Sequence, residues 1–453
     1  MDTSINFTPR PGNPFSWRTV PVAAVLILLW AAPLAGQTPG VKTTFVPLPG
    51  NGNGVLFEPE TPNSKSRIAV LNTHEGTSNN LNHPSGPQLA SRGYRVFIIN
   101  FYGDPVGFEG LAPLLADAVR YLRGLPGVQK VVLLGHSGGG PVMSFYQNVA
   151  ENGPGACQSP DRIYPCRGKL TDLPKADGLV LLDSHIGTGF QQLTYVDPAI
   201  RTGMRMTERD LAFDMFNPRN GFDPTTRKGA YSSEFTRNFF AGQAARNNEV
   251  IDYALSRLSK IEKGAGDYKD DEPFVVPASL NARLLQADVR LVSSTHDAHP
   301  LLKADGTIRT QIVESVRPSL VGETRSDLES LHGAMKTTVR QFLASFAMRA
   351  GRDYNMSANA ITGVDWASTN TSAVVNIEGV HMPTLIVAMS CHYFLVPDEV
   401  IYNHAAASDK QYMVVEGATH GFAPCRPGYG DTRKKVFDQV DAWLSDGKRF
   451  TLK

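Results

Sequence analysis

A serine in a glycine-rich turn is the feature of this sequence that points most directly to chemistry. Residues 135–139 read Gly-His-Ser-Gly-Gly and fit the pattern G-x-S-x-G. The preceding residues 130–134 have the apolar, β-branched composition of a buried strand, and residues 141–150 are compatible with a helix. In that context the serine lies on a sharp strand-to-helix turn, with its hydroxyl exposed above the sheet. The pattern therefore predicts that Ser137 is a nucleophile.

The glycines of this turn have a physical role. We expect a side chain at position 135 or 139 to collide with the neighbouring strand or helix, and only glycine adopts the required backbone angles at little cost. The helix that begins just after Ser137 directs its backbone N–H groups and the positive end of its dipole at the site. A tetrahedral oxyanion requires such donors. The alternative is a glycine-rich turn without chemistry, but the flanking strand and helix favour the nucleophile.

A serine hydroxyl is a poor nucleophile at neutral pH and needs an adjacent base. His420 is the candidate, because it comes soon after the last expected strand, Gln411 to Glu416, and has Gly417 and Gly421 on either side. The unperturbed pKa of histidine lies near neutral pH, which suits a group that takes up and returns a proton. The alternative is a histidine with a purely structural role.

The strand and helix around Ser137, and the order of serine before histidine, resemble the α/β-hydrolase superfamily. The resemblance covers about residues 41–185 and 380–450. It implies a mostly parallel sheet flanked by helices, with an inserted, mainly helical lid domain. Continuous apolar strands that alternate with helices also predict a parallel sheet covered on both faces, which is the α/β class. We expect a signal peptide at 1–36, the first part of the core at 37–185, the lid at 186–380 and the second part of the core at 381–453.

Three segments of the insert have a recognisable pattern. Residues 235–263 and 324–350 resemble long helices, and residues 289–318 resemble a β-hairpin with its turn at Lys303 to Thr307. The core pattern resumes with an apolar strand at residues 382–389. Because a domain inserted between core strands lies at their carboxyl edge, we expect the insert to cover the ligand crevice.

The acid of the expected triad departs from the superfamily pattern. The resemblance implies an aspartate shortly after the penultimate strand, but Tyr393 stands there. Asp398 comes later and has the position of a helix N-cap. A minority of the superfamily places the acid after the preceding core strand, where this chain has Asp183. We favour Asp183 over Asp398, with Glu416 as a third choice, as the group that holds the imidazole tautomer.

An oxyanion hole needs two donors. The resemblance implies that one is the backbone N–H of Gly138 and that the other comes from the turn after the strand at residues 67–72. That turn reads His74-Glu75-Gly76, a variant of the His-Gly turn of esterases. The sequence leaves open whether Glu75 or Gly76 donates.

Two histidines in the expected hairpin raise the question of a metal ion. His296 and His299 are separated by Asp297 and Ala298. A catalytic zinc needs a third protein ligand and an organised set of supporting hydrogen bonds, and the sequence offers no candidate for them. Exposed hairpin histidines are the simpler interpretation. We therefore expect neither a metal ion nor a cofactor.

The charge balance and the N-terminus bear on partners and compartment. The 44 lysines and arginines nearly cancel the 43 aspartates and glutamates, which argues against nucleic acid or an anionic membrane surface as a partner. Arg10 and Arg18 precede the apolar run at residues 20–32, and Ala35 and Gly36 follow it, in the order of a secretory signal. The run is short for a membrane span. We expect a secreted or periplasmic protein with no stable span in the mature chain; an uncleaved N-terminal anchor is the alternative.

The four cysteines agree with export. They allow three pairings, of which the simplest joins Cys157 to Cys166 and Cys391 to Cys425. No C-x-x-C pattern occurs, which argues against a redox or zinc-ribbon motif.

The sequence thus predicts an exported serine hydrolase that cleaves a carboxylic ester or related acyl bond of a small molecule. The resemblance implies that a serine at this turn excludes epoxide hydrolases and haloalkane dehalogenases, which use aspartate there. Peptidases, thioesterases and acyltransferases use the same machinery and remain alternatives. A non-catalytic ligand-binding protein that retains the fold is a further alternative, because Tyr393 stands where the superfamily usually has its acid. The substrate and the oligomeric state are left open.

Overall fold

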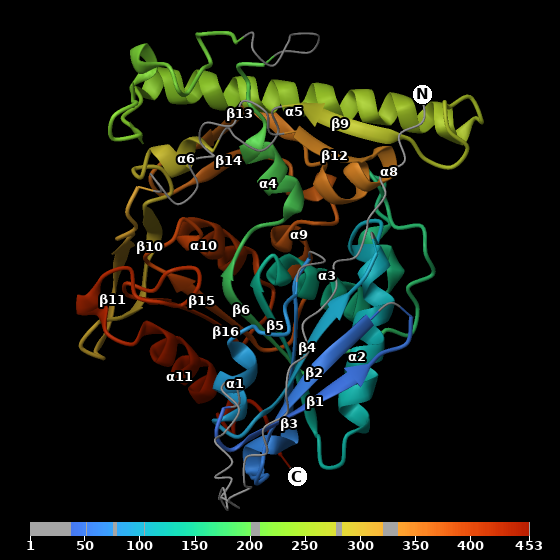
Figure 1. Cartoon of the computed structure of the whole chain (residues 1–453), viewed down its shortest axis with the longest axis vertical. Helices are drawn as coiled ribbons and strands as arrows, with labels where there is room; N and C mark the ends of the chain where they lie inside the picture. The colour runs from blue at the N-terminus through green and yellow to red at the C-terminus, as the bar shows by residue number, and fades with distance from the viewer. Residues whose placement is uncertain are drawn as a thin grey trace, which may run out of the picture. The chain divides into compact units, whose positions relative to one another are not determined.

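A ten-stranded sheet forms the centre of the protein (Figure 1). The computed structural model describes residues 38–50, 52–75, 79–103, 105–200, 209–277, 283–319 and 334–452. The expected signal peptide at 1–36 lies outside these residues. In spatial order the strands are β1 (Val41–Pro47), β2 (Gly52–Pro59), β4 (Arg95–Phe101), β3 (Ile68–Thr73), β5 (Lys130–Ser137), β6 (Gly178–Ser184), β15 (Thr384–Met389), β16 (Lys410–Val415), β10 (Ser294–Leu302) and β11 (Ile308–Glu314).

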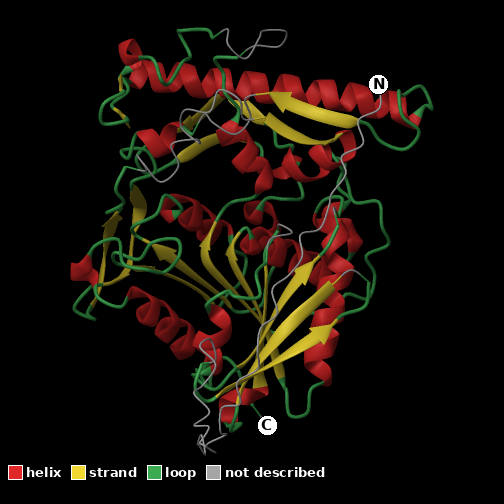
Figure 2. Cartoon of the chain, in the orientation of Figure 1, coloured by secondary structure: helices red, strands yellow, loops and turns green. Residues whose placement is uncertain are grey.

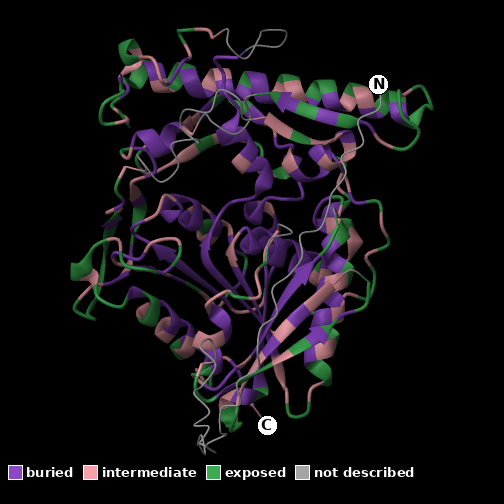
Figure 3. Ribbon diagram, in the orientation of Figure 1, coloured by how far each residue is buried: buried purple, intermediate pink, exposed green. Residues whose placement is uncertain are grey.

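The sheet is parallel from β4 to β10, and its pairings are antiparallel among β1, β2 and β4 and between β10 and β11. Alternate residues of one strand enter two separate cores: Val131 and Leu133 of β5 belong to one buried cluster, and Val132 and Leu134 belong to another. The inner strands are therefore apolar on both faces, and Figure 3 shows them buried. This arrangement confirms the expected α/β class.

Helices cover both faces of this sheet (Figure 2). The first buried cluster contains residues of α2 (Ala112–Gly124), α3 (Gly139–Asn152) and α10 (Leu395–His404). The second contains residues of α1 (Ser85–Ala90) and α11 (Thr432–Leu444). The segment predicted to be helical at residues 141–150 lies within α3, which begins slightly earlier, at Gly139.

Part of the insert between β6 and β15 belongs to the central sheet. The predicted hairpin is present as β10 and β11, but β10 pairs in parallel with β16 and so extends the sheet. The expectation that all of residues 186–380 form a separate lid is wrong for this hairpin. Backbone groups at the free edge of β16 require partners, and β10 supplies them.

The remaining elements of the insert gather beyond the end of the sheet at which β5 and β6 finish (Figures 1 and 2). They include one long helix, which agrees with the prediction for residues 235–263, and three small antiparallel pairs. They include α4 (Thr188–Tyr195), β7 (Phe222–Asp223) with β8 (Lys228–Gly229), α5 (Ser233–Glu262), β9 (Pro273–Pro277) with β12 (Ala334–Thr338), and β13 (Ala350–Met356) with β14 (Ile361–Val364).

The long helix predicted over residues 324–350 is wrong over Ala334–Thr338 and from Ala350 onward, and of its described residues only 339–346 are helical. Residues 320–333 lie outside the described part, and the segment from Ala334 forms β12, which pairs with β9. Strand pairing across the insert thus overrides the helical pattern of this segment, because tertiary contacts outweigh the small differences in local propensity.

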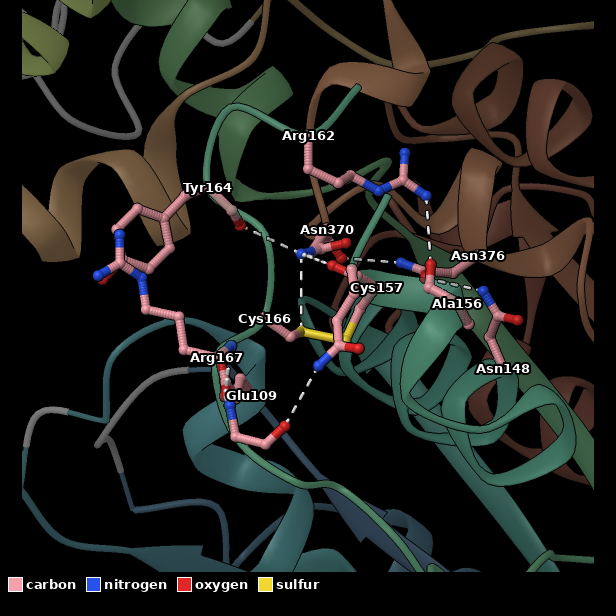
Figure 4. The surroundings of a disulfide bond; sticks show 12 residues. Glu109, Asn148, Ala156, Cys157, Arg162, Tyr164, Cys166, Arg167, Asn370 and Asn376 are labelled. Carbon is pink, nitrogen blue, oxygen red and sulfur yellow. Dashed lines mark hydrogen bonds between the residues drawn. A yellow bond between two sulfur atoms is a disulfide. The ribbon is translucent and has the colours of Figure 1, made fainter. Parts of the chain in front are cut away.

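All four cysteines form disulfides, in the pairing that the sequence favours: Cys157 with Cys166 and Cys391 with Cys425. Figure 4 shows Asn370 beside the first disulfide, with its amide directed at this loop. Asn370 Nδ2 donates to the carbonyl oxygens of Cys157 (3.0 Å) and Tyr164 (3.3 Å). The side chain therefore ties the loop after α3 to the end of the insert.

Candidate active site

Ser137 lies at the carboxyl end of β5, immediately before α3, in the predicted strand-turn-helix context. Its φ angle is +55°, a conformation that is costly for a residue with a side chain and is found mainly at functional sites. The backbone crowds this turn. A Cβ atom at Gly135 would lie 2.5 Å from Cα of Gly140, and one at Gly139 would lie 2.2 Å from the carbonyl oxygen of Thr73. Glycine is therefore required at 135 and 139 for the steric reason expected.

Asp183 and His420 are brought together next to this turn. Asp183 is the penultimate residue of β6, the strand beside β5, and has a φ angle of +44° and no exposed surface. Its Oδ2 lies 2.6 Å from Nδ1 of His420. Burial raises the pKa of Asp183, but His392 and His420 lower it further, so the carboxyl is ionised well below its ordinary range. Among the described residues, Asp183 is the acid bonded to the predicted base.

The loop that carries His420 is held from two sides. His136, the residue before Ser137, donates from Nε2 to the carbonyl oxygen of His420 (2.9 Å), and the two rings stack with centroids 4.5 Å apart. Burial, followed by the nearby His420 and His83, lowers the pKa of His136 well below its usual value, so the ring is neutral. The disulfide from Cys391 to Cys425 fixes the other side of the loop. His136, the first variable residue of G-x-S-x-G, thus positions the backbone of His420, the predicted base.

His392 is a component of the site that the sequence did not indicate. Its Nδ1 lies 2.7 Å from Oδ2 of Asp183, the same oxygen that faces His420, and its ring stacks on that of His420 with centroids 4.4 Å apart. Burial lowers its pKa, more strongly than Asp183 raises it. His392 directly precedes Tyr393, in the loop where the superfamily was expected to supply its acid. The loop in which the sequence pattern places the acid does contribute to the site, but the residue that it contributes is a histidine.

Asp183, His392 and His420 could be considered as metal ligands, since their ligand atoms lie within 4.8 Å of one another. Oδ2 of Asp183 forms a hydrogen bond with Nδ1 of His420 (2.6 Å) and lies 2.7 Å from Nδ1 of His392. Ligand atoms that share a zinc ion each stand about 2 Å from it, so they are separated by about 3 Å or more. The described geometry fits a shared carboxylate better than a metal site.

The other two candidate acids have different partners. Asp398 lies inside α10 and is fully buried, and its Oδ1 accepts a hydrogen bond from the backbone N–H of Ser184 (3.0 Å). The N-cap prediction for Asp398 is wrong, because the helix begins at Leu395. Burial and the nearby Asp183 raise the pKa of Asp398 well above its usual value. Glu416 pairs with Lys303 and supports the turn of the β10–β11 hairpin.

Glu75 lies against the predicted oxyanion donor. A Cβ atom built on Gly138 would fall 1.2 Å from Oε2 of Glu75, so the carboxylate covers this glycine. The carboxylate lies between His185 Nε2 (3.2 Å from Oε1) and His74 Nδ1 (2.9 Å from Oε2). Burial raises the pKa of Glu75, but the two histidines lower it well below its ordinary range. The turn that was expected to supply the second oxyanion donor does lie beside Gly138, but it places the ionised side chain of Glu75 there. Gly76 lies outside the described residues.

The two histidines of the hairpin lie in different surroundings. His296 is exposed and lies beside Asp297, whereas His299 is buried with Nε2 2.7 Å from Oε1 of Glu399. The Glu399 carboxylate also accepts the backbone N–H groups of His296 and Asp297. The described contacts give His299 a structural role.

A small cavity of about 30 Å³ adjoins the site. His185 and Phe394 form part of its wall. The ring of Phe394 contacts both His392 and His420, with centroids 4.4 and 5.4 Å apart, and the backbone N–H of His185 donates to the carbonyl oxygen of Ser137. The cavity therefore begins at the residues that surround the predicted nucleophile and base.

The strained serine turn at the carboxyl edge of a mostly parallel, helix-covered sheet defines the α/β-hydrolase fold, and the order Ser137, Asp183, His420 agrees with it. No family model and no curated protein matches the chain. Among solved structures the chain is similar to carboxyl esterase 2 from the fungus Tuber melanosporum (12% identity, 91% of this chain and 88% of the esterase, TM-score 0.39). It is also similar to a hypothetical protein from Pseudomonas aeruginosa (12% identity, 91% and 95% covered, TM-score 0.43). These TM-scores are too low for the similarity to indicate a function.

Proposed function

We propose that this protein is a serine hydrolase that cleaves a carboxylic ester or a related acyl bond. The observation on which the proposal rests is the strained Ser137 turn next to the hydrogen-bonded pair of Asp183 and His420. Asp183 holds the proton of His420 on Nδ1, which leaves Nε2 free to act as a base. This is the arrangement that a serine nucleophile needs.

The reaction has two halves. Ser137 Oγ attacks the carbonyl carbon while its proton passes to His420 Nε2, and the backbone N–H of Gly138 stabilises the oxyanion. The intermediate collapses, and the leaving group departs with the proton from His420. Water then attacks the acyl-enzyme with His420 again as the base, which releases the acid and restores Ser137. The second oxyanion donor comes from the turn that contains Glu75.

The insert acts as the lid of this site. The cavity beside the site is lined both by core residues, such as Phe394, and by residues of the insert, such as Leu285 and Met356. A substrate bound there is shielded from water on the side of the insert. The two disulfides and the expected signal sequence support export. No helix in the described part of the chain has the length and apolar character of a membrane span.

A fluorophosphonate probe tests the proposal, because it reacts covalently with an activated serine. We expect the parent protein to be labelled at Ser137, as located by peptide mapping, and Ser137→Ala to remain unlabelled. Asp183→Asn should be labelled much more slowly. Labelling at another residue, or equal labelling of the parent and Ser137→Ala, would refute the assignment.

The Glu75 side chain favours a second candidate, a non-catalytic binding protein. An ionised carboxylate beside Gly138 repels an oxyanion formed at the same place, and burial strengthens that repulsion. A binding protein would tolerate this charge, whereas a hydrolase has to offset it through His74 and His185. Absence of both probe labelling and turnover of activated esters would favour the binding protein.

A further inference from the structure

Arg283 places a cation in an otherwise mostly apolar cavity beside the site. The described residues that line this cavity are mainly apolar or aromatic and include no aspartate or glutamate. Its polar members include Gln191, Gln286 and Arg283, which come from the insert. The apolar wall includes Ile186, Phe190, Leu285, Val292, Met356 and Ile361. The lining thus combines an apolar channel with one permanent positive charge.

The contacts of Arg283 with the described residues leave its Nε without a hydrogen bond. Its guanidinium carbon lies 3.7 Å from the centroid of the Tyr195 ring, a stacking contact that fixes the plane of the group. Its Nε is buried and has no hydrogen-bond partner among the described residues. Other arginines of the insert differ: Arg209 pairs with Asp197 and Asp214. A stacked guanidinium with an unpaired Nε–H is suited to bind an anion.

Two opposite charges act on the cavity, one from its lining and one from behind its wall. Where the cavity adjoins the site, His185 of its wall contacts the ionised Glu75. Arg283 supplies a positive charge in the lining itself. A chain that carries one anionic group is therefore repelled by Glu75 and attracted by Arg283, so it enters in one orientation.

We propose that the cavity binds a part of the substrate that ends in a carboxylate, with Arg283 as the residue that recognises it. The substrate class is then the monoester of a dicarboxylic acid, with an apolar chain between the scissile ester and the free carboxylate. This inference rests on the proposed hydrolase function for the ester, whereas the binding of the carboxylate by Arg283 does not require turnover.

Paired substrates test the proposal. One p-nitrophenyl ester carries an acyl chain with a terminal carboxylate, and its partner carries the methyl ester of the same chain; a series of chain lengths covers the unknown span. For at least one length, we expect kcat/KM of the parent to favour the carboxylate substrate at least tenfold. In Arg283→Met the carboxylate substrate should lose about 100-fold, the order expected for charge-assisted hydrogen bonds, while the neutral substrate changes by less than about threefold. Arg283→Lys should lie between these values, because it keeps the charge without the planar fork.

A matched control and a binding measurement separate the two proposals. Arg309→Met removes an exposed arginine of β11 and should leave the preference unchanged. The Ser137→Ala variant cannot turn over, so its binding of linear dicarboxylates can be measured by calorimetry. We expect it to bind the dicarboxylate of the chain length that the parent prefers or, if the parent shows no turnover, one member of a C4–C10 series. Adding Arg283→Met should abolish that binding. If Ser137 is not labelled by the probe but the dicarboxylate still binds through Arg283, the hydrolase proposal fails and the carboxylate site stands. Equal losses for both esters in Arg283→Met, with no difference in dicarboxylate binding, would overturn the carboxylate site.

Discussion

Replacing Asp183 by asparagine tests the site most sharply. Asp183 Oδ2 faces Nδ1 of both His420 and His392, and its Oδ1 has no hydrogen-bond partner among the described residues. An asparagine has to direct its amide NH₂ either at the two ring nitrogens or into a position without an acceptor. The first orientation breaks the contact with His420, and the second leaves a buried donor unpaired.

The expected loss follows from the charge that Asp183 supplies. With charge centres about 4 Å apart and an effective dielectric constant of about 20, the carboxylate stabilises the imidazolium of His420 by about 4 kcal/mol. That energy corresponds to about three powers of ten in rate. The disfavoured tautomer adds to this, so we expect kcat for an activated ester to fall by about 10³–10⁴ in Asp183→Asn. A loss smaller than about tenfold would refute the assignment of Asp183 as the acid.

Asp398→Asn is the matched control, because Asp398 is also an aspartate with no exposed surface. Its raised pKa keeps the carboxyl neutral in the folded protein over a range where it ionises in the unfolded chain. The amide therefore replaces a neutral acid of the same shape and can still accept from the Ser184 N–H. Activity should change by less than about threefold. Stability should rise at pH values above about 4, because the parent loses stability as pH rises past the unfolded pKa of aspartate. A large loss of kcat in Asp398→Asn would transfer the acid role to it.

Three further changes have defined outcomes. Ser137→Ala should lower kcat by several orders of magnitude with unchanged thermal unfolding, and residual activity within about tenfold of the parent would contradict the nucleophile. Mild reduction of the Cys391–Cys425 disulfide, which spans a sequence separation of 34, should abolish turnover before circular dichroism shows global unfolding; simultaneous loss of both would contradict a local role for the bond. Burial, with His74 and His420 nearby, lowers the pKa of His83 to about 3. The unfolded chain then binds more protons at this site between pH of about 6.5 and 3, so stability falls as pH falls, by up to about 1.4 kcal/mol per unit. His83→Gln should flatten urea-derived stability between pH of about 6.5 and 5, and an unchanged slope would contradict a neutral His83.

The sequence by itself was sufficient for features that depend on neighbouring residues. The apolar runs of β3, β5, β6 and β15 predict strands buried on both faces, because side chains that alternate along a strand must be apolar when each face is covered. The crowding at Gly135 and Gly139 likewise follows from the close meeting of a strand and a helix. The local disulfide from Cys157 to Cys166 belongs to the same group, since a short loop keeps its ends close.

Only the tertiary structure decided the relations between residues far apart in the chain. In the sequence, Asp183 and Asp398 were both candidates for the acid of the triad. The order of the strands places Asp183 next to His420, whereas the Asp398 side chain is buried in the core. The contact of His392 with Asp183 and the position of Glu75 over Gly138 join segments that no local pattern relates. The pairing of β12 with β9 replaced an expected helix for the same reason. Each of these contacts depends on which strand edges and charged groups the folded chain brings together. The energies of such tertiary contacts exceed the local preferences of the residues for helix or strand.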